Sequence, residues 1–413
     1  MVIKNLTSVD TEIAAILDSY SATSFTPPAS QYTVAAAFFL TQPFKLISIA
    51  TGTKCLPTIR LPSTGEALHD SHAEVLARRG AVRWFLDEVT RCSSTDQPYS
   101  SPWIYASQNK RYSLHEGVQL HLYISTVPCG DASTRFLASL QDVEMATLKD
   151  STVFVPLSPG AASRGRDNYS RLGVLRTKPG RADSPPTLSM SCSDKIASWN
   201  VLGFQGALAS HFLGPLYLSR VIIGEVPLSM QSSVREDCER ALWRRLEGIH
   251  NLPSNYTLHA PAIHFTSLQF FHSRSVLEET GQASGSCNES LCWIANTKPH
   301  EILINGLKRG VSPKHRHREK SRPRTSKMAL FQLYANMTSN PSPPQERPTT
   351  TYYEAKRMIL DYQTAKECLM GPGGPFSGWV RGGVQWQNFA IDGNKHHKKV
   401  SIMHDCASEV NCP

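Results

Sequence analysis

Two short segments contain residues with the types and spacing of a catalytic zinc site. His72-Ala73-Glu74 provides an imidazole followed two residues later by a carboxylate, and Pro128-Cys129 provides a thiolate. Zinc binds imidazole and thiolate groups tetrahedrally, and a catalytic site leaves the fourth position to water. Either motif alone is common by chance, so the prediction depends on both occurring in this order. Glu74 is then the expected proton carrier, because it lies beside a ligand without being one.

The third zinc ligand is predicted to be Cys192. A cysteine three residues after Cys129 is the usual choice, but that position is Ala132. Cys192 lies in a polar turn before a predicted helix, which is unlike the setting of an inert core cysteine. A helix N-terminus also favours thiolate over thiol. His72, Cys129 and Cys192 with Glu74 form the pattern that zinc-dependent deaminases use.

The elements that position these residues follow from the apolar periodicity. A helix over 72–90 begins at His72, and the alternation of residues 118–124 predicts a half-buried strand that leads to Cys129. The remaining expectations are a helix over 8–20, a helix over 33–40, a strand over 44–50, a helix starting at Asp131 or Ala132, a helical stretch from Cys192 to His211 and a strand over 216–226.

Composition limits the class of protein. The chain has 413 residues, 40% hydrophobic and 19% charged, which favours a packed core. We expect residence inside the cell, in the nucleus or cytoplasm, because neither a secretory signal nor a stretch of about 20 apolar residues is found. The ten cysteines form no CxxC pair, so free or metal-bound thiols are expected. The net charge of +9 favours a polyanionic partner such as RNA.

The chain shows no repeat and no clear linker, so we expect one elaborated α/β domain over residues 1–413. Insertions are expected near 156–187 and 281–326, which are rich in loop-forming or basic residues. Lys314 to Arg324 is strongly basic. It is interpreted as a contact for an RNA backbone, a solvated loop or a nuclear-import signal, and the sequence does not choose among these.

Two groups of basic residues are unusual. Arg78, Arg79 and Arg83 fall within the apolar arc of the 72–90 helix, and Arg79 lies near its middle. Buried guanidinium groups need an anionic partner. Four further residues would share one face if they lay on a single helix: Tyr352, Lys356, Tyr362 and Lys366. That face is either solvated or one wall of a polyanion site, and the spacing alone favours the solvated face.

These segments resemble the RNA adenosine deaminases, a family that comprises a tRNA-specific branch and double-stranded-RNA editing enzymes. The resemblance extends over nearly the whole chain and depends on Thr51-Gly52-Thr53-Lys54-Cys55, His72-Ala73-Glu74 with Arg78-Arg79, Pro128-Cys129-Gly130-Asp131, Ser191-Cys192-Ser193-Asp194-Lys195 with Trp199-Asn200, Gly203-Phe204-Gln205-Gly206, and Tyr352 to Lys366 with Trp379-Val380. After Lys178 the chain reads Pro179-Gly180-Arg181-Ala182-Asp183, as in the tRNA-specific branch, which converts adenosine 37 of alanine tRNA to inosine.

The resemblance implies a cytidine-deaminase-like mixed sheet sandwiched by helices, with C-terminal helical and strand elaborations around a buried polyphosphate. It implies one catalytic zinc ion, with Cys192 as the third ligand, and inositol hexakisphosphate as a structural cofactor. Residues matching the polyphosphate site are Arg78, Arg79, Lys195, Tyr352, Lys356, Tyr362, Lys366 and Trp379. Asp70, Lys178 and Lys195 match a polar relay to the zinc, and Thr53 and Lys54 match residues near the flipped nucleotide.

Ser198 and Arg381 depart from the pattern of the double-stranded-RNA enzymes, where Arg and Glu often stand. The partner implied is tRNA, with no membrane and no obligate protein partner. Two other functions are weighed against tRNA deamination. The first is a deaminase of structured or double-stranded mRNA, and the second is a zinc module that binds RNA without catalysis. An intact Glu74 argues against the second, since a structural zinc site fills all four positions.

Overall fold

The fold is a mixed α/β arrangement. The structure, a computed structural model, describes residues 7–94, 98–107, 109–140, 157, 161–165, 171–178, 184–281, 285–316, 318–338 and 350–391. The strands are β1 (Gln31–Tyr32), β2 (Ala35–Thr41), β3 (Lys45–Thr51), β4 (Ile104–Ala106), β5 (Tyr112–Leu114), β6 (Gln119–Ile124), β7 (Ser163–Arg164), β8 (Arg176–Thr177), β9 (Leu218–Ile223), β10 (Ala262–Phe265), β11 (Gly285–Ser286), β12 (Glu289–Ile294), β13 (Glu301–Ile304) and β14 (Leu307–Lys308). The helices are α1 (Ser8–Ser21), α2 (Ala73–Cys92), α3 (Thr134–Ser139), α5 (Cys192–Leu202), α6 (Gly206–Ala209), α7 (Gln231–Leu242), α8 (Arg274–Glu279), α9 (Lys327–Thr338), α10 (Tyr352–Arg357) and α11 (Leu360–Met370).

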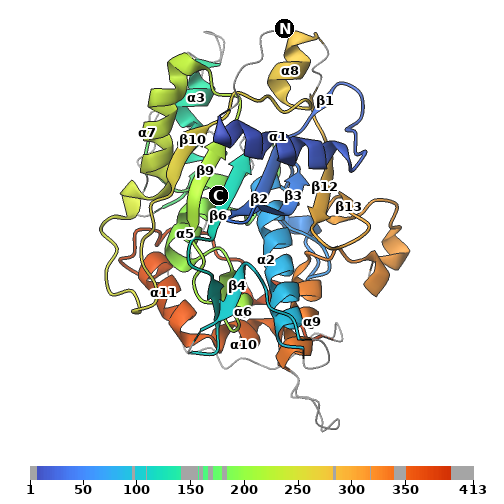
Figure 1. Ribbon diagram of the computed structural model, residues 1–413, viewed down its shortest axis with the longest axis vertical. Helices are drawn as coiled ribbons and strands as arrows, with labels where there is room; N and C mark the ends of the chain where they lie inside the picture. Colours follow the sequence, from blue (N-terminus) through green and yellow to red (C-terminus); the bar gives the residue numbers. More distant parts are fainter. Residues whose placement is uncertain are drawn as a thin grey trace, which may run out of the picture.

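Eight strands form the central sheet, in the order β10-β9-β6-β2-β3-β12-β13-β14. Strands β10, β9 and β6 are parallel to one another, and every pairing from β6 to β14 is antiparallel. Helix α1 crosses one face of this sheet (Figure 1). Helices α2, α5 and α7 pack against the other face. The expected mixed sheet with helices on both faces is therefore confirmed.

Strand β2 corrects the prediction of a helix over 33–40. Its side chains alternate between the two apolar layers, with Phe39 on the α1 side and Phe38 on the α2 side. All residues from Ala35 to Leu40 are buried, because β2 lies in the middle of the sheet. A strand covered on both faces reads as a continuous apolar run, and its three alanines favoured a helix by propensity.

Strand β6 is also more buried than predicted. The alternation in 118–124 predicted a half-buried strand, but His121 and Tyr123 are both fully buried. His121 is accommodated by polar partners, since its Nε2 lies 2.8 Å from Thr41 Oγ1 and its Nδ1 lies 3.3 Å from Arg220 Nε. The imidazole of His121 therefore marked a buried hydrogen-bonding position and not a solvent-facing one.

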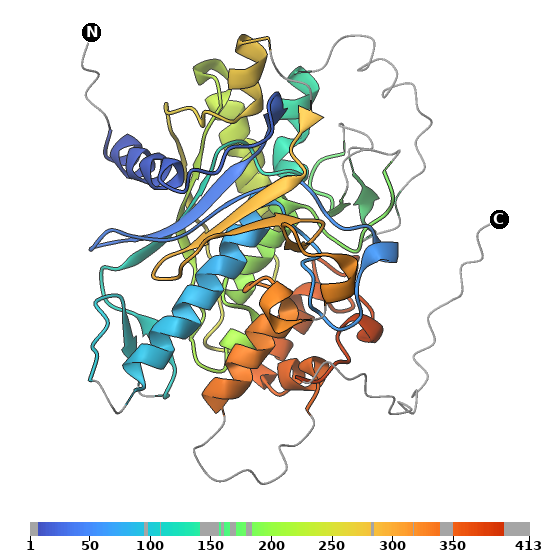
Figure 2. The ribbon, with the colours of Figure 1, turned by 90° about the vertical axis from the view of Figure 1, so that its right-hand side faces the viewer.

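The C-terminal helices gather beside α2, below the sheet (orange and red, Figure 2). Residues 352–366 do not lie on one helix, the condition on which they would share a face, because the chain breaks between α10 and α11 at Met358 and Ile359. The range 281–326, expected as an insertion, contains the sheet strands β12, β13 and β14. Among the described residues no helix is both long and apolar enough to cross a membrane.

Candidate functional site

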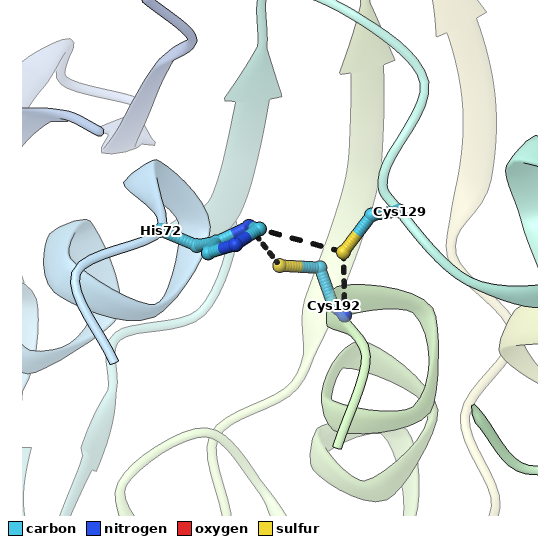
Figure 3. A group of neighbouring side chains, drawn as sticks. All are labelled: His72, Cys129 and Cys192. Atoms are coloured by element: carbon cyan, nitrogen blue, oxygen red, sulfur yellow. Dashed lines mark hydrogen bonds between the residues drawn. The ribbon is translucent and has the colours of Figure 1, made fainter. Parts of the chain in front are cut away.

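The structure brings His72, Cys129 and Cys192 together from three elements (Figure 3). His72 immediately precedes α2, Cys129 follows β6, and Cys192 begins α5. His72 Nδ1 lies 3.8 Å from Cys129 Sγ and 3.6 Å from Cys192 Sγ. Tetrahedral zinc with its ordinary bond lengths would separate such nitrogen and sulfur atoms by about 3.6 Å. The donor set therefore fits zinc and leaves one position for water.

Close backbone approach allows this convergence. Gly130 has φ +112°, and a Cβ there would lie 2.1 Å from Ser191 Oγ. The backbone N–H of Cys192 donates to Cys129 Sγ at 3.3 Å, and Ser193 Oγ donates to the carbonyl of Cys129 at 2.9 Å. The first residue of α5, Cys192, thus lies beside Cys129 and provides the third donor. Ala132, the position nearer in sequence, has no metal-binding group.

Glu74 is buried in the first turn of α2. Burial and the negative charge of Cys129 raise the pKa of its carboxyl above the ordinary value. Within the described parts of the chain, no group hydrogen-bonds to its Oε2 atom. A buried carboxylate without a partner is costly in a purely structural role, so this oxygen is available for water or substrate.

The predicted relay residues are in contact. Asp70 accepts hydrogen bonds from Lys178 Nζ at 2.9 Å, from Lys195 Nζ and from the backbone N–H of His72 at 3.0 Å. Burial would raise the pKa of Asp70, but Lys178 and Lys195 hold it well below its usual range. Lys178 Nζ also donates to Cys192 Sγ at 3.1 Å. The chain of contacts thus runs from Cys192 through Lys178 and Asp70 to Lys195.

Two participants in this network were not predicted. Ser189 donates from its Oγ to Asp70 Oδ2 at 2.5 Å and accepts from Lys195 Nζ at 2.6 Å. Cys55 has its thiol within 4.8 Å of ligand atoms of both Asp70 and His72. Cys55 belongs to one of the motifs that carry the family resemblance, but nothing in the pattern around Ser189 distinguishes it from other serines of the same loop.

A cationic cavity of about 310 Å³ lies next to the relay. Its lining includes Arg78, Arg79, Lys195, Lys327, Tyr362, Lys366 and Trp379. Burial lowers the pKa of Arg78 to about 10, of Lys327 to about 7 and of Lys366 to about 8. Cations whose protonated forms are this disfavoured lack a compensating anion.

Tyr352 and Lys356, predicted to belong to the polyphosphate site, do not line this cavity. Lys356 Nζ donates to Gln387 Oε1 at 2.7 Å and stands 5.1 Å from the ring centre of Tyr352. Burial and the charge of Arg79 lower the pKa of Lys356 to about 8. Both residues are half-buried in positively charged surroundings, which favours the polyanion-site alternative for residues 352–366 over the solvated face.

Thr53 and Lys54 lie between the start of α2 and the segment 285–287. Lys54 Nζ donates to Ser286 Oγ at 2.8 Å, and Thr53 Oγ1 donates to the carbonyl of Cys287 at 3.4 Å. The backbone carbonyl of Lys54 accepts from Ser71 N–H at 2.9 Å, which ties this segment to the His72 region. The loop Pro179 to Asp183 lies outside the described residues.

Comparison with known proteins gives a consistent result. Residues 48–382 match the model of the adenosine-deaminase (editase) domain family. The chain is 28% identical to a tRNA-specific adenosine deaminase 1 of Mus musculus, over 84% of this chain and 88% of that protein. It is 30% identical to a tRNA-specific adenosine deaminase 1 of Drosophila melanogaster, over 82% of this chain and 86% of that protein. A double-stranded RNA-specific editase B2 of Mus musculus is 30% identical, over 64% of this chain and 34% of its own length.

Proposed function

The chain belongs to the adenosine-deaminase (editase) domain family, a family of hydrolases, and on that premise we propose that it converts adenosine to inosine in tRNA. The observation that carries the proposal is the convergence of His72, Cys129 and Cys192 beside the buried Glu74, whose Oε2 has no hydrogen-bond partner among the described residues. This arrangement combines a three-donor metal site with a proton carrier, which is what hydrolysis of an aromatic amine requires.

The proposed chemistry divides between metal and protein. Zinc held by the three donors would supply a water molecule whose pKa is lowered toward neutrality. Glu74 would take a proton from the water that attacks C6 of adenine and would return it to the departing amino group, which leaves as ammonia. The raised pKa of Glu74 favours the step in which its carboxylate accepts a proton. Lys178 stabilises the thiolate of Cys192 throughout.

The cationic cavity is proposed to hold a polyphosphate, specifically inositol hexakisphosphate. Several cations meet there with few carboxylates, and their lowered pKa values show the cost of leaving them without an anion. A bound polyphosphate would offset that cost and fasten α2 to α9 and α11. Lys195 would then connect this ligand to the zinc site through Asp70.

Adenosine 37 of alanine tRNA is the proposed target. An unpaired anticodon-loop base costs less to extract than one in a duplex. The relatives named tRNA-specific adenosine deaminase 1 match this chain over most of their own length, whereas the editase B2 matches over about a third of its own. These coverages favour tRNA over double-stranded mRNA.

The deciding experiment incubates the zinc-loaded protein with unmodified alanine tRNA, with an A37G variant of that tRNA and with a duplex RNA, and reads inosine in each. We expect inosine only in the first. Inosine mainly in the duplex would favour the mRNA alternative, and tight RNA binding without inosine in any substrate would favour the non-catalytic module.

A further inference from the structure

A second basic pocket lies on the outer side of α2 and is separate from the polyphosphate cavity. It has a volume of about 230 Å³ and lies between α2, α9, β14 and the turn Glu319–Ser321. Its charged and amide lining consists of Arg83, Lys308, Glu319, Arg322, Arg324, Gln332 and Asn336. We propose that this pocket binds backbone phosphates of the RNA substrate. The inference extends the proposed function, on which it rests, by adding a binding surface outside the catalytic centre.

The pocket presents charge to solvent. The side chains of Arg83, Lys308 and Arg324 retain 24%, 28% and 27% of their exposure. Their carboxylate partners lie outside the lining, since Asp87 pairs with Arg83 from the same helix and the buried Glu301 pairs with Lys308 and Arg324. Four cations and one carboxylate therefore face the cavity, together with two amides that can donate hydrogen bonds.

The size of the pocket and its surroundings indicate the ligand. A volume of about 230 Å³ is below the range of about 300–1,000 Å³ typical of small-molecule sites, which suits a phosphate better than a whole nucleotide. The adjoining segment exposes Lys314, Arg318 and Lys320 beyond the rim. A free phosphate would not reach these cations, whereas a polymer of phosphates contacts both them and the pocket. These observations favour a nucleic-acid backbone.

The position of the pocket is compatible with one RNA molecule reaching both sites. Arg83 lies ten residues along α2 from Ala73, or about 15 Å of helix. The turn that carries Lys308 is joined to the catalytic segment, because the carbonyl of Gly306 accepts from Leu68 N–H at 2.9 Å. At a rise on the order of 3.4 Å per phosphate, a single strand spans this distance in about five nucleotides.

The test adds negative charge to the pocket wall without removing a cation. In the double variant Gln332→Glu/Asn336→Asp two amides of α9 become carboxylates of nearly the same shape, which pair with the arginines and preserve the fold. The matched control is Asn109→Asp/Gln119→Glu, two exposed amides near the edge of the β4–β5 hairpin and at the start of β6. Each protein carries Glu74→Gln so that binding is measured without turnover, and thermal unfolding checks the fold.

We expect the pocket variant to bind alanine tRNA about ten-fold more weakly at 0.15 M salt. The slope of log Kd against log salt should fall by about one for each phosphate that the pocket no longer neutralises. The control should match the parent in both quantities. An unchanged Kd and salt slope in the pocket variant would overturn the proposal. So would a weaker stabilisation by inorganic phosphate with unchanged tRNA binding, since the pocket would then hold a free anion.

Failure of the proposed function can be told apart from failure of this inference. The proposed function fails if the active protein forms no inosine. The pocket inference fails if the pocket variant binds tRNA as tightly as the parent, whatever the activity.

Discussion

Glu74 illustrates how a single residue can be assigned a role from its surroundings. The residue lies at a helix start beside three metal-donor side chains, yet its Oε2 has no hydrogen-bond partner among the described groups. Its raised pKa follows from burial and from the nearby Cys129 thiolate. Asp70, by contrast, accepts hydrogen bonds from two lysines. The two acidic residues thus differ in role because they differ in partners.

The substitution Glu74→Gln should reduce the rate of inosine formation by about 10²-fold to 10⁴-fold, because an amide cannot accept and return the proton. Zinc content, measured by metal analysis of the purified protein, should remain unchanged, since Glu74 is not a ligand. Glu279→Gln, at an exposed site on α8, is the matched control and should behave as the parent protein. Full activity in Glu74→Gln would contradict the assignment.

Lys178 offers a second test at this scale. Its ammonium group donates to Cys192 Sγ and to Asp70, so Lys178→Met removes a positive charge in contact with the proposed zinc ligand Cys192. We expect zinc affinity to fall about 10-fold to 100-fold, as is typical when a residue supporting a ligand is removed. Competition with a chelator gives this affinity, and Lys110→Met, at an exposed site, is the control. Equal zinc affinities in the two variants would rule out this role.

At the scale of elements, the site depends on where helices begin. Helix α2 starts directly after His72, and α5 starts at Cys192 with Ser191 as its cap, whose Oγ accepts from the Asp194 N–H. The loop after β6 must then pass close to the cap of α5, and Gly130 permits this approach. Two helix starts and one loop therefore bring the three donor side chains together.

The substitution Gly130→Ala should move the loop after β6 away from the start of α5. A side chain at φ +112° costs about 1–3 kcal/mol in backbone strain, and its Cβ would overlap Ser191 Oγ as well. We expect a lower melting temperature together with loss of bound zinc. Gly373→Ala is the control, because Gly373 has φ +79° but open space around it, so only stability should decrease. If both variants retained zinc equally, the close approach would not be what positions Cys129.

At the scale of the whole molecule, buried positive charge couples the C-terminal helices to α2. The cationic cavity is closed by residues from segments more than 100 positions apart, including Arg79, Lys195 and Lys366. Packing alone would not favour this grouping, since like charges repel and burial disfavours each of them. A polyanion bound there would act as part of the core.

The pH dependence of stability follows from these charges. Lys327 and Lys366 have pKa values lowered to about 7 and about 8, against 10.5 for a free side chain. At pH values between these lowered pKa values and 10.5, the unfolded protein binds more protons than the folded protein. The free energy of unfolding should therefore rise as pH increases from about 7 to about 10. Added inositol hexakisphosphate should stabilise most near pH 7, where the lysines are protonated, and should flatten the profile.

Thermal unfolding of the anion-free protein at several pH values, with and without inositol hexakisphosphate, measures both effects. Sulfate at the same concentration controls for nonspecific anion binding. A profile that does not change on adding the polyphosphate would contradict a polyphosphate site in this cavity.

The sequence by itself determined the chemistry of the site. The order and spacing around His72, Glu74, Cys129 and Cys192 were sufficient to predict which side chains meet, because each lies at the end of a regular element. The helices over 8–20 and 72–90 and the strands over 44–50 and 216–226 were predicted for the same reason, since their apolar periodicity reports their burial.

Only the tertiary structure decided the features that depend on neighbours remote in the chain. The run from Ala35 to Leu40 reads as a helix until the strands on both sides of it are known. In the sequence, Arg79, Lys327 and Lys366 are three separate basic residues. Only the folded chain shows that they line one cavity. Local preference and periodicity are properties of short segments, whereas burial between layers and the sum of buried charges arise only when those segments pack.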